Sequence, residues 1–427
     1  DGGNGNGFDG IQVTRFEDND RNLCGAITPA SVPGAVRLDS SAQSFALAQN
    51  QSDAVALLFN SSSGGYSYVQ DLFGAGIGQL VPAGTPYDLS VAPTPVATAT
   101  STATATAAAA LITDGTSETI LNDGSSGVAL TVSPNTSPQG IVALTSLTNS
   151  PPQYGNYVPF SAPTYKLKTP FGTSFDNIDA LIDTSNVMTV IVRGTNDLIA
   201  IGVTNAPTGY QFNVESENKA LGSNVPLRGF GRMAIDPANA GRALVGGTSS
   251  GADGQLTLVT GMPAAVTATS TLTLAGAINS ISFAPEYGAY AAIGTTAGIV
   301  IVGGTNSSAL AQLTPFGAGI RYYTPTYTNC NGTKSVMTDI LSIGFSADGK
   351  YLVALGTATG VTCPSGYNAT IVAIPFTSTT GATPAPSSYA TPTPAPSGSP
   401  SPSPLPRFVQ QNNVIPPPAN ADFMVVH

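Results

Sequence analysis

The stretch GFSADGKYLVALGT, residues 344–357, places two apolar runs on either side of an Asp-Gly pair. Asp348 and Gly349 tolerate the positive φ angles that a tight hairpin turn requires. Apolar runs flanking such a pair are the strongest short-range signal for a β-hairpin. The stretch therefore predicts two antiparallel strands, and whether the pattern recurs decides the fold.

The hairpin pattern does recur along the chain. Three segments combine an apolar strand, a polar turn, a second apolar strand and a closing Gly-Thr: residues 180–195, 233–248 and 281–295. Weaker copies begin near Val36, Tyr87 and Val128. Third strands are predicted downstream at residues 255–259, 298–302 and 369–374. The spacing of roughly 40 to 60 residues fits one four-stranded propeller blade for each unit.

The predicted fold is all-β, a seven-bladed β-propeller with an extended Pro-rich C-terminal tail. No long helical stripe of apolar residues is present. The alternatives are a β-sandwich, which rarely reaches this length as one unit, and a β-solenoid, whose repeats are shorter and stricter. Residues 1–30 form an N-terminal extension, in which a strand near Gly10–Phe16 could complete the last blade. The propeller spans residues 31–378, and residues 379–427 are a Pro/Ser/Thr-rich tail ending in a short apolar strand.

The segment FSADGKYLVAL, residues 345–355, resembles the repeat of the YVTN/lactonase-like β-propellers, whose blades carry an S-P-D-G-K-x-x-Y-V type of hairpin. The match extends to the units near residues 233 and 281 and concerns blade architecture. The resemblance implies a propeller fold. Lactonase-like enzymes of this fold place polar catalytic or metal-binding residues at the central channel, but no such residue maps onto this sequence, so no activity is carried over.

Composition argues against several classes of partner. Only 9% of the residues are charged, the net charge is -10, and Lys and Arg together number 14. A nucleic-acid binder needs a basic surface, and so does a protein held on anionic lipid by charge. No apolar stretch is long enough for a membrane-spanning helix. The chain starts at Asp1, so we expect a mature extracellular or cell-surface protein whose signal peptide has been removed.

Cysteines and glycosylation sequons fit that compartment. Cys330 and Cys363 flank the opening hairpin, and we predict a disulfide between them. Cys24 is left over, either as a buried free thiol or as a site for an intermolecular bridge. The candidate glycosylation sites are Asn50, Asn60, Asn135, Asn306, Asn331 and Asn368.

The residues needed for most catalytic sites are scarce. His427 is the only histidine, which removes Ser-His-Asp and Cys-His catalysis and histidine-ligated zinc. Asp183 and Asp236 could in principle act as a hydrolytic carboxylate pair. They recur at one place in their hairpins, however, which favours a turn-capping role. The Gly/Asn-rich residues 1–9 do not match the twelve-residue calcium loop. We therefore predict no catalytic residues, no metal, no cofactor and no enzymatic activity.

The tail carries the functional hypothesis. Residues 381–418 are rich in proline and favour extended polyproline II structure. They lead to an apolar tip, Phe423, Met424, Val425 and Val426. We predict a non-enzymatic extracellular structural protein, a subunit that self-assembles with other copies of itself into a filament or surface layer through this tail. The alternative is a secreted propeller on a stalk that binds a ligand or glycan. A hydrolase using carboxylates in the channel is a third possibility.

Overall fold

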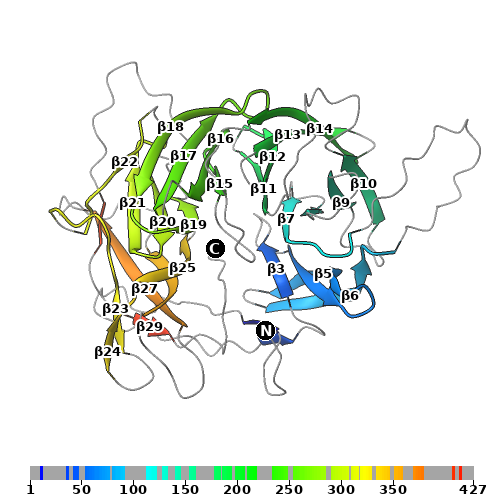
Figure 1. Ribbon diagram of the computed structural model, residues 1–427. Helices are drawn as coiled ribbons and strands as arrows, with labels where there is room; N and C mark the ends of the chain where they lie inside the picture. Colours follow the sequence, from blue (N-terminus) through cyan, green and yellow to red (C-terminus); the bar gives the residue numbers. More distant parts are fainter. Residues whose placement is uncertain are drawn as a thin grey trace, which may run out of the picture.

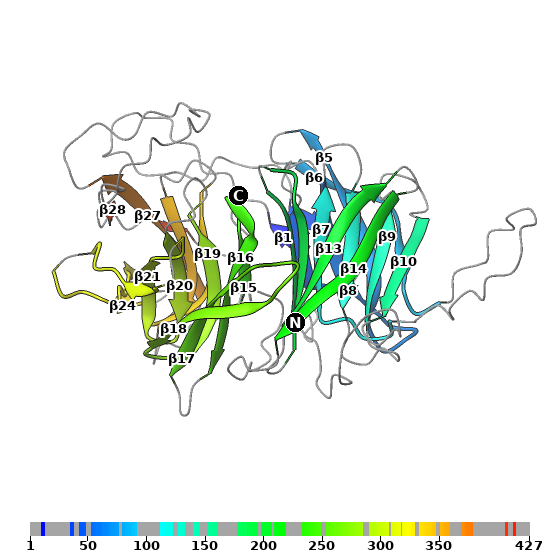
Figure 2. The same cartoon turned by 90° about the horizontal axis from the view of Figure 1, so that it is seen from above.

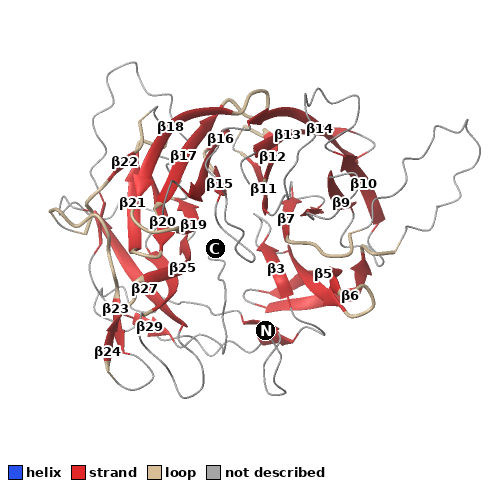
Figure 3. Ribbon diagram, in the orientation of Figure 1, coloured by secondary structure: helices blue, strands red, loops and turns tan. Residues whose placement is uncertain are grey.

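The protein was analysed as a computed structural model. It describes residues 10–12, 35–37, 42–47, 53–76, 79–91, 112–122, 127–132, 140–145, 153–159, 177–183, 185–194, 198–206, 209–218, 233–248, 253–284, 290–306, 309–316, 318–328, 333–346, 351–358, 369–378, 406–408 and 413–415. Within these residues the regular structure consists of β-strands, and no helix is present (Figure 3).

Five four-stranded sheets and one five-stranded sheet make up most of the fold. The first sheet contains β3 (Ala42–Leu47), β4 (Asp53–Asn60), β5 (Gly65–Gly76) and β6 (Gln79–Asp88). The second contains β7 (Ser117–Asn122), β8 (Gly127–Val132), β9 (Gly140–Thr145) and β10 (Gln153–Pro159). The third contains β11 (Asn177–Ile182), β12 (Met188–Arg193), β13 (Leu198–Ala206) and β14 (Gly209–Asn218).

The remaining sheets follow the same antiparallel order. The fourth contains β15 (Met233–Asp236), β16 (Asn239–Thr248), β17 (Gly254–Thr260) and β18 (Thr267–Leu274). The fifth contains β19 (Ile278–Phe283), β20 (Tyr290–Thr295), β21 (Gly298–Gly303) and β22 (Ala311–Gln312). The last contains β25 (Asp339–Phe345), β26 (Tyr351–Thr357), β27 (Ala369–Ser378), β28 (Pro406–Phe408) and β29 (Asn413–Ile415). Two small sheets pair β1 (Gly10–Gln12) with β2 (Ala35–Arg37) and β23 (Thr326–Thr328) with β24 (Lys334–Val336).

The large sheets stand around a common centre in chain order, which is a propeller arrangement (Figures 1 and 2). The first strand of each sheet is the innermost. These inner strands contact one another in the order β3, β7, β11, β15, β19 and β25. Within each four-stranded sheet the strands follow one another outward, so neighbours in sequence are neighbours in space.

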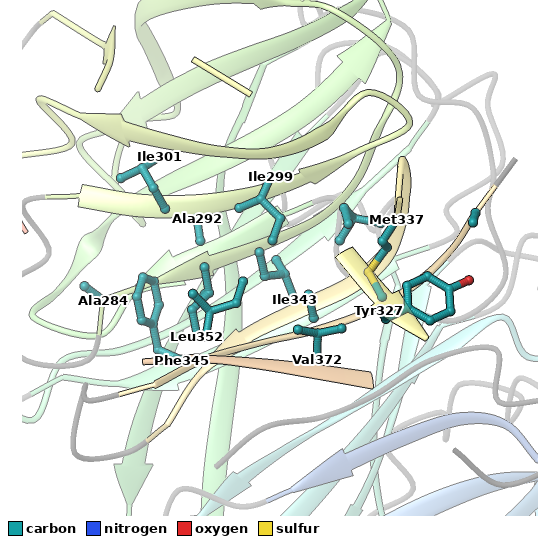
Figure 4. Close-up of a cluster of buried hydrophobic side chains, with 14 residues drawn as sticks. Ala284, Ala292, Ile299, Ile301, Tyr327, Met337, Ile343, Phe345, Leu352 and Val372 are labelled. Atoms are coloured by element: carbon teal, nitrogen blue, oxygen red, sulfur yellow. The ribbon is translucent and has the colours of Figure 1, made fainter. Parts of the chain in front are cut away.

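The core lies between neighbouring sheets. Because side chains alternate between the two faces of a strand, a strand that is covered on both sides must be apolar at successive positions. In β21, Ile299 and Ile301 face the last sheet, and Val300 and Val302 face the fourth. All four side chains are fully buried. Figure 4 shows the cluster between the fifth and last sheets, which includes Phe345. The Phe345 ring also meets the Tyr290 ring edge to face.

The opening hairpin is confirmed. β25 pairs antiparallel with β26, and Phe345 lies opposite Leu352. Ser346 and Tyr351 hold the strand ends together, because the Ser346 N–H donates to the Tyr351 carbonyl at 2.9 Å and the Tyr351 N–H donates to the Ser346 Oγ at 2.9 Å. The hairpins predicted over 180–195, 233–248 and 281–295 are also present, as are the predicted third strands.

The prediction of seven blades is not met. The described residues form five four-stranded blades and the last, five-stranded sheet. Two of the weak copies are not hairpins, and the one at Tyr87 has no sheet of its own among the described residues. The segment at Val36 is not a hairpin, because β2 pairs with β1 while β3 pairs with β4. The segment at Tyr87 begins at the end of β6, which is the outer strand of the first sheet.

The strand predicted near Gly10–Phe16 is present as β1 over Gly10–Gln12, with a different partner from the one expected. β1 pairs with β2 and not with the last sheet. The outer strands of the last sheet come instead from the tail, as β28 and β29. A three-residue strand carries too little pattern to select its partner, so its pairing is decided by which free sheet edge lies beside it.

Candidate functional site: the inner strands and the edge of the last sheet

The inner strands have one edge without a strand neighbour, facing the centre of the ring. Backbone N–H groups on such an edge need other acceptors, because an unpaired buried N–H is costly. Side chains of the preceding sheet supply them. The Glu118 N–H on β7 donates to the Ser44 Oγ on β3 at 3.1 Å. The Ile343 N–H on β25 likewise donates to the Ser280 Oγ on β19 at 3.1 Å.

A carboxylate takes the same role between the third and fourth sheets. The Ile235 N–H on β15 donates to the Asp179 Oδ2 on β11 at 3.1 Å. Asp179 stands three residues before the last residue of its strand, as Ser44 and Ser280 do in theirs. The recurrence of a small polar residue at this position is a sequence signal for the contact between neighbouring sheets.

The fifth and last sheets are joined by additional side-chain hydrogen bonds. Asn279 sits at a register shift in β19, which frees its side chain to reach the neighbouring strand. Its Nδ2 donates to the Asp339 Oδ1 and to the Ile340 carbonyl, both at 2.9 Å. β3 and β25 have register shifts at the matching place. The bulge is thus part of how adjacent sheets are joined.

Several carboxyl groups are buried in these joints. Burial raises the pKa of Asp179 to about 6, against the lowering effect of N–H donors from Ile235 and Ala180. Burial also raises the pKa of Glu118 well above its usual value, and the backbone at Leu57 offsets this only in part. The pKa of Asp339 is raised by burial and lowered by its hydrogen bond to Asn279. These groups hold protons in the folded protein at pH values where an exposed carboxyl is ionised.

Asp183 and Asp236 have the turn-capping geometry expected from their positions. The Asp183 Oδ1 accepts from the N–H groups of Ser185 at 2.8 Å and Val187 at 2.9 Å. Its Oδ2 accepts from the Ala240 N–H of the next sheet at 3.1 Å, which ties the two turns together. Asp236 accepts from the Ala238 N–H at 2.9 Å and forms a 2.5 Å ion pair with Arg242.

The outer edge of β27 is occupied by the tail. β28 pairs with residues 376–378 of β27, and β29 pairs with residues 371–373. Both pairings are antiparallel, so β28 and β29 run in the same direction along β27. Neither strand was predicted, because each is only three residues long and follows a Pro-rich segment.

Of the candidate glycosylation sites, two are described and they differ sharply. Asn306 is exposed in a turn. Asn60 is fully buried, and its Nδ2, the atom that would carry a glycan, donates to the Ser67 Oγ at 2.9 Å and to the Asp88 Oδ1 at 3.1 Å. The folded structure therefore has no room for a glycan at Asn60, and this residue organises a buried turn network instead.

The other predicted site residues lie outside the described residues, and the predictions about them stand as predictions. They are Cys24, Cys330, Cys363, Asn50, Asn135, Asn331, Asn368, Phe423, Met424, Val425 and Val426. Within the described ranges, no cluster of three or more His, Cys, Asp or Glu residues could hold a metal ion. The same part of the chain contains no helix with the length and apolar character to cross a membrane.

No protein-family model matches the sequence, and no curated protein matches it. Solved structures resemble it distantly. A protein from Lactobacillus plantarum is 10% identical, with 80% of this chain and 83% of that one covered and a TM-score of 0.45. A 6-phosphogluconolactonase-like protein from Bacteroides uniformis is 12% identical, with 80% and 82% covered and a TM-score of 0.43. The WD40 domain of SCAP from fission yeast is 8% identical, with 81% and 64% covered and a TM-score of 0.45. Similarity this low carries no conclusion about activity.

Proposed function

We propose that this chain is a non-enzymatic extracellular structural protein, a propeller subunit that assembles with copies of itself through its C-terminal tail. Its hairpin at residues 345–355 also leads us to propose kinship with the YVTN/lactonase-like propellers. The observation that carries the proposal is the pairing of tail strands β28 and β29 with the edge of β27. A tail that adds strands to a sheet edge has the chemistry of β-strand addition, a common mode of protein association.

The periphery supports association by strands. β18 is the outer strand of its sheet, and Thr267–Leu274 contains no charged residue and no proline. Most of its side chains are exposed or partly exposed. Soluble proteins usually protect such edges with lysine, proline or a bulge that interrupts pairing. β18 has neither lysine nor proline, and one register shift interrupts its pairing with β17 between Ala268 and Ser270. An uncharged, Thr-rich edge therefore suits a subunit that packs against others.

The apolar tip gives the tail a second means of contact. Burying Phe423, Met424, Val425 and Val426 on a neighbour would contribute about 1.5–3 kcal/mol for each large side chain, before the cost of ordering the linker. A contact between the tail of one copy and the body of the next is heterologous, so it need not close on itself. Repetition of that contact would produce a filament or layer.

Electron microscopy and light scattering of three forms test the proposal. The full chain is expected to form filaments or layers, and deletion of residues 382–427 is expected to leave monomers. A length-matched variant with Ser at positions 423–426 separates the tip from the rest of the tail, and it is expected to assemble more weakly. Assembly of the deletion form to the same extent as the full chain would contradict the proposal.

A further inference from the structure

The last sheet obtains its outer strands in an unusual way. In the first and third sheets, the fourth strand follows the third after only two residues, 77–78 and 207–208. In the fourth sheet the connection is residues 261–266. In the last sheet, β28 follows β27 only after residues 379–405. The outer position of this sheet is therefore filled by a segment tethered through a long connection, not by a hairpin neighbour.

The tethered segment is held by few pairings. Phe408 lies opposite Phe376 and Pro406 opposite Ser378, while Ile415 lies opposite Ile371. Between the two strands the register advances by two residues, so β28 and β29 follow each other along β27 with a two-residue offset. Such short strands have little stability of their own, and releasing them breaks few backbone hydrogen bonds.

Pairing within one chain requires the connection to return to its starting point, whereas its composition favours extended conformations. Ser378 and Pro406 are directly opposite each other, so residues 379–405 must begin and end at the same place. This segment contains eight prolines, which favour an extended polyproline II conformation. Fully extended, it would span roughly 85 Å at about 3.1 Å per residue. A compact body of this size is only ~50 Å across, so the extended connection reaches a second copy.

We propose that β28 and β29 exchange between copies and pair with the outer edge of β27 of a neighbouring copy in the register seen here. The inference rests on the proposed function, since it identifies the acceptor edge that the tail uses. An exchanged strand makes the same backbone pairings as a strand within one chain. The equilibrium between pairing within one chain and pairing between chains therefore depends on the connection and on the protein concentration. An extended connection shifts this equilibrium toward pairing between chains. Each copy donates one strand and accepts another, so the contact propagates.

Cysteine pairs divided between two chains test the exchange. Thr377 and Arg407 are direct partners in the antiparallel pairing. Their Cα atoms should lie about 4.5–5.5 Å apart, within the range that a disulfide bridges. Full-length Thr377→Cys and isotope-labelled Arg407→Cys chains are refolded together and oxidised. Peptide mapping by mass spectrometry then identifies the 377–407 disulfide apart from links of the natural cysteines. We expect this disulfide between labelled and unlabelled chains.

Two further pairs serve as controls. Val372→Cys with Val414→Cys repeats the test at the second pairing, in case one position distorts the strand. Arg407→Cys with Val336→Cys places the partner on β24, where the side chain is exposed but not opposite the tail, and it should give no specific link. A chain carrying both Thr377→Cys and Arg407→Cys should form disulfide-linked ladders that lengthen with concentration.

The outcomes separate the inference from the proposed function. Disulfides confined to single chains at both pairings would overturn the exchange, while loss of assembly on deleting residues 382–427 would still support the proposed function. Links between chains that stop at closed dimers would support the exchange and contradict the filament or layer. The absence of any link, even in the double-substituted chain, would overturn the register on which the inference rests.

Discussion

The partly buried carboxyl of Asp179 should make the protein less stable as the pH rises from about 4 to about 7. In the folded protein its pKa is raised from 3.8 to about 6, chiefly by burial. The folded state therefore keeps a proton that the unfolded chain releases at lower pH. The stabilisation is complete below the unfolded pKa and is lost as the pH rises through the folded value.

The magnitude follows from the size of the shift. One pKa unit corresponds to about 1.4 kcal/mol, so Asp179 accounts for at most about 3 kcal/mol of stability lost over this window. This value is an upper limit, because part of the Asp179 side chain is exposed to solvent and water screens its charge. Glu118, Asp236 and Asp339 have pKa values shifted in the same direction by burial, so they steepen the overall slope.

The free energy of unfolding is measured in urea at a series of pH values for the natural chain and for Asp179→Asn. The difference between the two isolates the contribution of the Asp179 carboxyl to stability. Asparagine resembles the protonated carboxyl and does not ionise. The variant should therefore gain stability relative to the natural chain as the pH rises, by up to about 3 kcal/mol between pH 4 and 7.5. Asp253→Asn makes the same chemical substitution at an exposed position and serves as the control for the substitution itself. An identical slope in the natural chain and Asp179→Asn would refute the reasoning.

Three other predictions concern the joints and the surface. Ser280→Ala removes the acceptor of the Ile343 N–H and should cost about 1–3 kcal/mol in urea unfolding; a cost near zero would mean that this N–H finds another acceptor. Produced in a glycosylating host, the protein should carry glycan at Asn306 and none at Asn60 by peptide mass spectrometry; a glycan at Asn60 in folded protein would contradict the buried network. The disulfide between Cys330 and Cys363 should appear in a non-reduced digest and contribute roughly 3–4 kcal/mol, and two free thiols there would disprove it.

Local chemistry made the hairpins predictable. The apolar runs flanking residues 346–350 gave β25 and β26 directly, and successive apolar residues in 298–302 gave a strand that is buried on both faces. The turn roles of Asp183 and Asp236 were also readable, because an Asp side chain bonds backbone N–H groups only a few residues away. Each of these features depends on neighbours in sequence.

The sequence by itself determined an all-β chain built from repeated hairpins, because turn chemistry and the alternation of strand side chains act over a few residues. Only the tertiary structure decided the number of sheets, the burial of Asn60 and the pairing of residues 406–415 with β27. Hydrogen bonds along a sheet edge are made by the backbone and accept almost any sequence. Which segment fills an edge therefore depends on what the folded chain brings beside it, and not on the residues of the segment alone.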